Sequence, residues 1–130
     1  MIVVDASVMA YVLAGEGAQK AAARAALAAD EHWAAPEHWK VEVVSSVRGM
    51  LLGGKVTESR ARQAIDTLGQ LSVVPVSIND LLERIWELRH NVSAYDAAYV
   101  AAAELRDATL LTMDARLARA GGLKCPVRVV

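Results

Sequence analysis

Four acidic residues are candidates for a metal site, and three of them lie where a carboxylate is costly unless it has a function. Asp5 directly follows an apolar run, and so does Asp114, while Asp96 interrupts a stretch of alanine, tyrosine and valine. Glu42 falls inside a segment with the character of an amphipathic helix. A carboxylate beside buried segments costs free energy unless it is paired, capped or bound to a cation. The spread of these acids along the chain suggests a shared site that only folding assembles.

A site built from four carboxylates has a definite chemistry. Acids held close together repel one another unless they are protonated or bind a cation. Carboxylate oxygens are hard ligands, which favour Mg²⁺ or Mn²⁺. Each acid also has an ordinary interpretation. Asp5 and Asp114 can be helix N-caps, Asp96 has the capping-box spacing from Ser93, and Glu42 can be a solvated helix residue.

The charge balance is consistent with such a site. The 130-residue chain has a formal net charge of −1, with 15 acidic and 14 basic residues. Setting the four candidate acids aside leaves 11 acidic against 14 basic residues, a balance of +3. An acidic pocket in a mildly basic surrounding suits a polyanion that arrives with divalent cations. Ordinary scatter of charges on a near-neutral protein is the alternative.

Composition predicts a globular, intracellular protein. The hydrophobic content of 55% excludes disorder, and abundant alanine without any phenylalanine predicts closely packed helices. No apolar run approaches the ~20 residues that a membrane span needs, and no signal peptide is recognisable. The single cysteine, Cys125, cannot form an internal disulfide, which fits a reducing compartment. We therefore expect a cytoplasmic protein, and its large apolar fraction favours a homodimer.

Short apolar runs alternate with helical patterns along the chain. This alternation predicts a parallel sheet covered by helices on both faces, in one domain spanning residues 1–130. The fold class is therefore a three-layer α/β/α sandwich with a short, mainly parallel sheet of four to five strands. Strands are expected at 2–4, 32–35, 71–78, 109–113 and 126–130, and helices at 7–13, 17–30, 36–52, 57–69, 79–90, 93–106 and 114–120.

This arrangement would bring the acids together. Ligand sites of parallel sheets lie beyond the carboxyl ends of the strands. Asp5 follows the first predicted strand and Asp114 the fourth, so the two acids meet if those strands are neighbours. Asp96 lies in the first turn of its helix and should face an edge of the sheet. Glu42 shares a helix face with small or polar residues such as Ser46 and leaves room for ions and substrate.

Four segments that together span the chain resemble PIN-domain proteins, specifically the VapC-type toxins of bacterial toxin–antitoxin pairs. The segments are IVVDAS at 2–7, PEHWKVE at 36–42, SAYDAAYVAAAE at 93–104 and LTMDARL at 111–117. The resemblance implies a divalent-metal-dependent endoribonuclease with a PIN-like fold. It also implies inhibition by a small VapB-type antitoxin. By this match, the metal-site acids are Asp5, Glu42, Asp96 and Asp114.

Roles for these residues follow from phosphodiester hydrolysis. Metal ions held by carboxylates can activate water, stabilise the pentacovalent phosphate and protect the leaving oxygen. We expect Asp5 to be the central ligand, with Asp96 and Asp114 beside it. Glu42 can bind metal directly, hold a metal-bound water or serve as base.

Three further residues could support this chemistry. Ser7 and Thr112 are candidates to orient the carboxylates or water, although a helix cap and a strand threonine are equally good interpretations. Arg116 is a candidate contact for an RNA phosphate; its alternative is a solvated arginine.

Three other functions compete with a nuclease. A receiver-like phosphoacceptor needs an acid at the end of its central third strand, but residues 73–77 contain none. A phosphatase of the haloacid-dehalogenase type needs a second aspartate two residues after Asp5, where Ser7 stands. A catalytically silent PIN-like module that binds a protein partner is disfavoured by the intact acid quartet, yet it stays open at this point.

Overall fold

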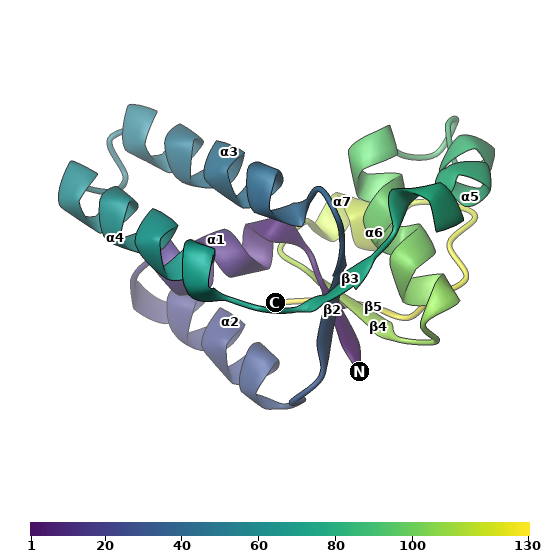
Figure 1. Ribbon diagram of the computed structural model, residues 1–130, viewed down its shortest axis with the longest axis horizontal. Coiled ribbons are helices and arrows are strands. Elements are labelled where there is room, and N and C mark those ends of the chain that lie inside the picture. Colours follow the sequence, from purple (N-terminus) through teal and green to yellow (C-terminus); the bar gives the residue numbers. More distant parts are fainter.

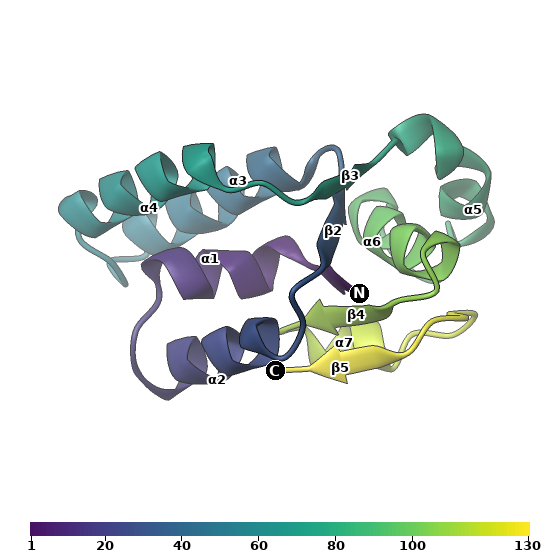
Figure 2. The same ribbon diagram turned by 60° about the horizontal axis from the view of Figure 1, so that its bottom comes forward.

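The protein is described by a computed structural model that covers residues 1–130, and its core is a five-stranded parallel sheet. The strand order is β3-β2-β1-β4-β5, which is visible in Figure 2 as successive strands from top to bottom around β1. The strands are β1 (Ile2–Val4), β2 (Trp33–Pro36), β3 (Val74–Val76), β4 (Thr109–Thr112) and β5 (Val127–Val129). The helices are α1 (Ala6–Ala14), α2 (Gly17–Ala28), α3 (Trp39–Leu52), α4 (Glu58–Gln70), α5 (Leu82–Glu87), α6 (Ala94–Leu105) and α7 (Ala115–Ala118), with a 3₁₀ turn η1 (Ile78–Asp80).

The first strand is the centre of the sheet. All three residues of β1 are buried, as expected for an apolar strand covered on both faces. It pairs with β2 through the register Val3 to Ala34 and with β4 through the register Val3 to Leu110. The first and fourth strands are therefore neighbours, which is the condition under which Asp5 and Asp114 meet.

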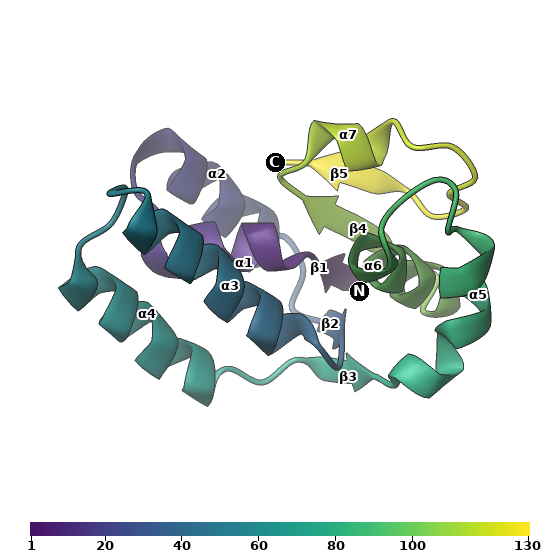
Figure 3. The same ribbon diagram turned by 90° about the horizontal axis from the view of Figure 1, so that it is seen from above.

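Helices cover both faces of the sheet, which confirms the predicted fold class. Figures 1 and 3 show α1 to α4 grouped on one side of the strands, and α5 with α6 on the other. The helix α7 lies against β4 and β5. Within the first group, α3 and α4 form a long antiparallel pair that extends away from the sheet (Figure 1).

Alanine explains how closely α6 packs. Seven consecutive residues of this helix, Ala97–Ala103, are buried, and five of them are alanine. The helix contacts β1, β2 and β4. Small side chains let its backbone approach the strands, and the hydroxyl of Ser93 caps its first turn by accepting a hydrogen bond from the Asp96 backbone N–H at 3.2 Å.

Several element boundaries differ from the sequence expectation. Pro36 was expected in the first turn of a helix, but it is the last residue of β2 and pairs with Val76 of β3. The pairing of β2 with β1 ends at Ala34, so the missing N–H of proline interrupts no hydrogen bond to the central strand. The third strand is only three residues long and lies at a sheet edge, as Pro75 indicated.

The helix expected at 79–90 is divided into η1 and the short α5, which ends at Glu87. Leu81 is buried between the two segments, and the free backbone groups there are used in turn-type hydrogen bonds to Ser77 and Ile78 carbonyls. The helix α7 is likewise shorter than expected. None of the helices is long and apolar enough to cross a membrane.

Candidate active site

Three neighbouring strands deliver three of the four acids to one edge of the sheet. Asp5 follows β1, Asp114 follows β4 after one intervening residue, and Glu42 lies in the first turn of α3, which follows β2. Because β2, β1 and β4 are adjacent and parallel, their carboxyl ends lie side by side. The sheet order therefore places these three acids at a common edge.

The fourth acid reaches the same edge from a helix. The helix α6 leads into the start of β4 through a tight turn at Asp107, a residue with a φ of 50°. Since α6 runs back along the sheet, its first turn lies near the carboxyl ends of the strands. Asp96 is in that first turn, and the charges of Asp5 and Asp114 both act on its carboxylate.

Asp5 is the most deeply placed acid and is held by two hydrogen bonds. Its side chain is 7% exposed. The Ser7 backbone N–H donates to Oδ1 at 3.0 Å, and the Thr112 hydroxyl donates to Oδ2 at 2.7 Å. Thr112 Oγ1 in turn accepts from the Asp114 backbone N–H at 3.0 Å. The buried Thr112 hydroxyl thus connects the Asp5 side chain to the backbone of Asp114.

Ser7 makes a second connection between the same two segments. Its hydroxyl oxygen accepts a hydrogen bond from the Met113 backbone N–H at 3.2 Å. The loop before Asp114 is therefore attached to the first turn of α1. The structure places Ser7 and Thr112 where residues that orient the acids would have to lie.

Asp114 faces outward and is paired with Arg116. Its Oδ1 accepts from the Arg116 backbone N–H at 2.8 Å and lies 3.3 Å from Arg116 Nε. These contacts, the backbone hydrogen bond foremost, lower the pKa of Asp114. The Arg116 side chain is 85% exposed, so the pair is weak and can open at little cost. The position of Arg116 at the rim is compatible with contact to a phosphate.

Glu42 and Asp96 are half-buried, and the site disfavours the ionised form of each. Burial is the largest cause that raises the pKa of each carboxyl, and the negative charge of Asp5 adds to both. Asp114 further raises the pKa of Asp96. Like charges held in a partly desolvated cluster destabilise the ionised protein. A cation bound among these acids would relieve that repulsion.

Two residues beside Glu42 were not identified as site residues from the sequence. The His38 Nε2 atom lies 3.6 Å from Glu42 Oε1, and both His38 ring nitrogens are buried without a hydrogen-bond partner. Burial lowers the pKa of His38, which favours the neutral ring. The Tyr99 hydroxyl is buried and unpartnered as well. Burial first, and then the Glu42 and Asp5 charges, raise the pKa of Tyr99 far above its usual value.

Helical spacing could have indicated both residues. His38 precedes Glu42 by four positions, and Tyr99 follows Asp96 by three, so each lies on the same helix face as an acid. The rings are packed together, with centroids 5.2 Å apart. Tyr99 is fully buried, and only the tertiary structure shows that it packs beside the acids.

The donor set fits a hard divalent cation, although the side chains are not arranged around one. Four carboxylates at one edge supply the oxygen ligands that Mg²⁺ and Mn²⁺ prefer. No group of three or more His, Cys, Asp or Glu side chains is positioned so that it could hold a metal ion. Asp5 is engaged with Ser7 and Thr112, and Asp114 with Arg116. Ligation by Asp114 therefore requires its carboxylate to turn away from Arg116.

The capping interpretations hold for two acids only. Asp5 and Asp114 each cap a helix through the side-chain bonds described above. Capping and ligation are compatible, because a carboxylate has several lone pairs. The N-cap of α6 is Ser93, and no backbone N–H is capped by Asp96. Glu42 is not a freely solvated helix residue, since its side chain is only 25% exposed.

The fold agrees with comparisons to known proteins. Residues 2–123 match the family model of the PIN domain, so the chain belongs to the PIN-domain family. Its curated relatives include two ribonucleases of Mycobacterium tuberculosis. VapC9 is 39% identical over 100% of this chain and 98% of its own length. VapC1 is 42% identical over 98% of this chain and 96% of its own length.

Solved structures show the same fold at lower sequence identity. VapC20 of Mycobacterium tuberculosis, described as a sarcin–ricin loop cleaving toxin, aligns with a TM-score of 0.70 at 20% identity, covering 97% of this chain and 99% of its own. VapBC2 from Rickettsia felis, solved with a DNA fragment of its promoter, aligns with a TM-score of 0.67 at 16% identity, covering 100% of this chain and 99% of its own.

The electrostatic strain predicts that Asp96→Asn stabilises the metal-free protein. The substitution keeps shape and removes one charge that burial and Asp5 disfavour. A folded pKa above the ordinary value of 3.8 means that ionised Asp96 destabilises the fold at neutral pH, and that this penalty disappears as pH falls through the raised pKa. The stability difference between variant and wild type should therefore be largest near pH 7 and shrink on acidification.

Urea unfolding in EDTA at several pH values measures this difference. Comparing the two proteins is necessary because buried His38, with its lowered pKa, makes the wild type lose stability over the same acidic range. Asp66→Asn on the exposed face of α4 is the control and should bring no gain. Added Mn²⁺ should stabilise the wild type more than Asp96→Asn. Equal Mn²⁺ responses would remove Asp96 from the ligand set.

Proposed function

We propose that this protein is a metal-dependent endoribonuclease, the toxin of a VapBC-type toxin–antitoxin pair. The observation that carries the proposal is the position of Asp5, Glu42, Asp96 and Asp114 at one edge of the sheet of a PIN domain. The full-length similarity to ribonucleases of the VapC group supports RNA as the substrate. An RNA substrate in turn puts the action of the protein in the cytoplasm.

The residues of the site would have different roles in catalysis. Asp5, Asp96 and Asp114 would hold Mg²⁺ or Mn²⁺, with Glu42 as a direct ligand, as holder of a metal-bound water, or as base. The bound cation would supply an activated water and stabilise charge on the phosphate. Thr112 and Ser7 orient the Asp5 carboxylate through the bonds of 2.7 and 3.0 Å.

The raised pKa of Glu42 bears on its role. A carboxyl whose pKa lies above the ordinary 4.5 is a stronger base once ionised. The neighbouring Tyr99 hydroxyl and neutral His38 ring lie in position to orient it. Glu42 is thus the acid of the site best suited to accept a proton from water, while Asp5 is best suited to ligation.

The competing functions find less support. A receiver-like domain needs its acid on a central third strand, but β3 reads Val-Pro-Val and lies at the edge of the sheet. A silent binding module would have no reason to keep Glu42 and Asp96 half-buried in mutual repulsion. The nuclease accounts for that cost, because a bound cation would compensate it.

Substitution of the acids tests the proposal directly. Asp5→Asn, Asp96→Asn and Asp114→Asn should each lower Mn²⁺-dependent cleavage of total cellular RNA on the order of 100-fold, since each removes a negatively charged ligand. EDTA should abolish cleavage by the wild type. The control Asp66→Asn removes an exposed acid from α4 and should retain full activity. Undiminished cleavage by all three site variants would show that the hydrolytic site lies elsewhere.

We further propose a small VapB-type antitoxin that covers this site and inserts a cationic side chain among the acids. The negative charge of the site supports this, together with the fold similarity to VapBC2 and to a toxin–antitoxin complex from Klebsiella pneumoniae. The product of a small neighbouring reading frame should co-purify with the protein and suppress RNA cleavage. A product that neither binds nor inhibits would speak against the assignment.

A homodimer is the expected oligomeric state. Large apolar side chains remain exposed on the isolated chain, including Val41 at 74%, Leu52 at 67% and Trp86 at 68%. Apolar surface of this kind is favourably removed from water by association. Sedimentation at micromolar concentration should give about twice the mass of 13.9 kDa. A purely monomeric protein under those conditions would refute the dimer.

A further inference from the structure

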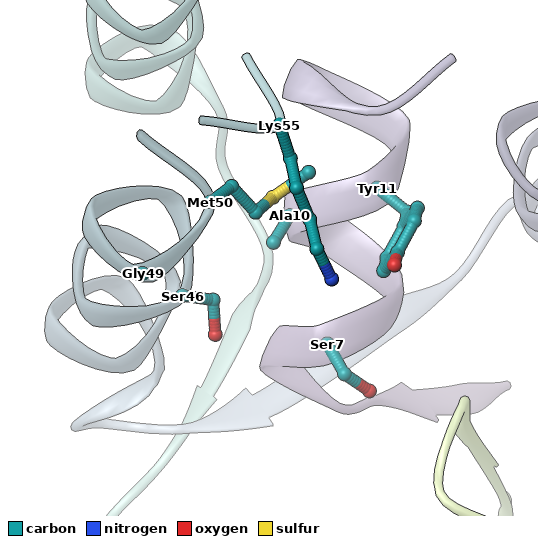
Figure 4. Close-up of a pocket in the computed structure, with 7 residues that line it drawn as sticks. All are labelled: Ser7, Ala10, Tyr11, Ser46, Gly49, Met50 and Lys55. Atoms are coloured by element: carbon teal, nitrogen blue, oxygen red, sulfur yellow. The ribbon is translucent and has the colours of Figure 1, made fainter. Parts of the chain in front are cut away.

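A pocket of about 290 Å³ opens beside the acid cluster, between α1 and α3. Its polar lining consists of Ser7, Tyr11, Ser46 and Lys55, and Gly49 forms part of the wall (Figure 4). The proposed metal site uses none of Tyr11, Ser46, Gly49 and Lys55. Tyr11, Ser46 and Lys55 place two hydroxyl groups and one ammonium group around an open space.

The pocket adjoins the proposed catalytic site through residues of both helices. On the α1 side it begins at Ser7, whose backbone N–H binds the Asp5 carboxylate at 3.0 Å. On the α3 side it begins at Ser46, which follows Glu42 by four residues on the same helix face. That spacing is about one helical turn, or roughly 6 Å along the axis. A chain lying across the acids therefore has one of its neighbouring units at this pocket.

The end of α3 directs Lys55 into the pocket. Gly54 has a φ of +70°, and its backbone N–H donates to the Leu51 carbonyl at 3.1 Å. The Lys55 N–H donates to the Met50 carbonyl at 2.9 Å. These two bonds form a Schellman motif, which turns the chain back over the last turn of the helix. Figure 4 shows the Lys55 side chain extending between the two helices, with its nitrogen toward the end where the Ser7 and Ser46 hydroxyls lie.

The ammonium group of Lys55 has no charged partner, whereas the Ser7 hydroxyl of the same pocket already accepts a hydrogen bond from the Met113 backbone N–H. Lys55 takes part in none of the ion pairs of the molecule. No acidic side chain lines the pocket. An unpaired ammonium group flanked by serine and tyrosine hydroxyls is a donor set for an anion, and a phosphate oxygen is the acceptor that suits it.

We propose that this pocket binds an RNA backbone phosphate next to the scissile one, with Lys55 as its cationic contact. The inference rests on the proposed ribonuclease function. It makes Lys55 a positioning residue that holds the strand in register while the acids act on the neighbouring phosphodiester. A strand phosphate fits better than a free small anion, because the pocket adjoins the acids and has only one cation.

Removing the charge of Lys55 tests the phosphate contact. Lys55→Met keeps the length of the side chain, and Lys124→Met removes an equal charge from the exposed turn before β5. Binding of a fluorescein-labelled, mixed-sequence single-stranded RNA in EDTA should be roughly three- to tenfold weaker for Lys55→Met. The slope of log affinity against log salt should fall in magnitude by about 0.7, the loss of one contact to a single strand. Lys124→Met should match the wild type.

Filling the pocket gives an independent test. A Cβ added at Gly49 meets no atom within 4 Å, and the same holds for Gly69 on α4. Gly49→Leu should therefore fold normally and narrow the pocket, while Gly69→Leu adds the same bulk elsewhere. Both replace a helical glycine with a better helix former, so neither should lower thermal stability. Gly49→Leu should raise KM for Mn²⁺-dependent cleavage with little change in kcat, and Gly69→Leu should leave both constants unchanged.

The outcomes separate this inference from the function on which it rests. A wild type that neither binds nor cleaves RNA with Mn²⁺ overturns the proposed function, and the subsite with it. A wild type that cleaves RNA, with Lys55→Met equal to Lys124→Met in affinity and salt slope, overturns the subsite alone. An unchanged KM in Gly49→Leu would likewise exclude passage of the strand through the pocket.

Discussion

The buried carboxylate of Asp5 is the constraint around which the edge of the sheet is organised. At 7% exposure it must have its oxygens satisfied, because an unpaired buried charge costs several kcal/mol. The first turn of α1 supplies one donor, and the Thr112 hydroxyl at the end of β4 supplies the other at 2.7 Å. Satisfying this single group therefore fixes both the start of α1 and the end of a neighbouring strand.

The position of the other acids follows from that arrangement. The Thr112 hydroxyl also accepts a hydrogen bond from the Asp114 backbone N–H, which holds the backbone of this second acid next to Asp5. Glu42 and Asp96 then approach from helices that flank the same edge, and the charge of Asp5 acts on both. The fold keeps these groups together against their repulsion through the packing of α6 and the sheet, in which Tyr99, Val100 and Leu110 are fully buried. The binding of cations would relieve this repulsion.

The pocket at Lys55 would add a contact to RNA outside the reacting centre. The acids alone would repel a polyanion, so the strand needs cationic and hydroxyl contacts to either side. The turn at Gly54 places one ammonium group on the α3 side, and the exposed Arg116 lies on the α7 side. A negative centre between positive flanks would hold an RNA strand more tightly when cations occupy the centre, which would couple binding to metal.

The sequence by itself determined much of this protein. The β-branched run before Asp5, the capping residues Thr57 and Ser93, and the proline of β3 predict their elements because the causes are local: side-chain shape, a hydroxyl near a free N–H, and a missing donor. Alternation of strands and helices predicts the parallel sheet, and hence an edge where acids that follow strands can meet. The family segments predict the four acids by number.

Only the tertiary structure decided which groups surround those acids. The strand order sets Asp5 between the ends of β2 and β4, and no local pattern encodes an order of strands. Pro36 reads locally as a helix start, yet it ends β2 and pairs with β3. It is tolerated there because the pairing of β2 with β1 has already ended at Ala34. The burial of His38 and Tyr99 beside Glu42 and the position of Lys55 in its pocket depend on contacts between distant segments. The carboxylates lose water and interact with one another only when the chain is packed. The residue types therefore indicate metal chemistry, but the pKa values of Glu42 and Asp96 depend on the fold.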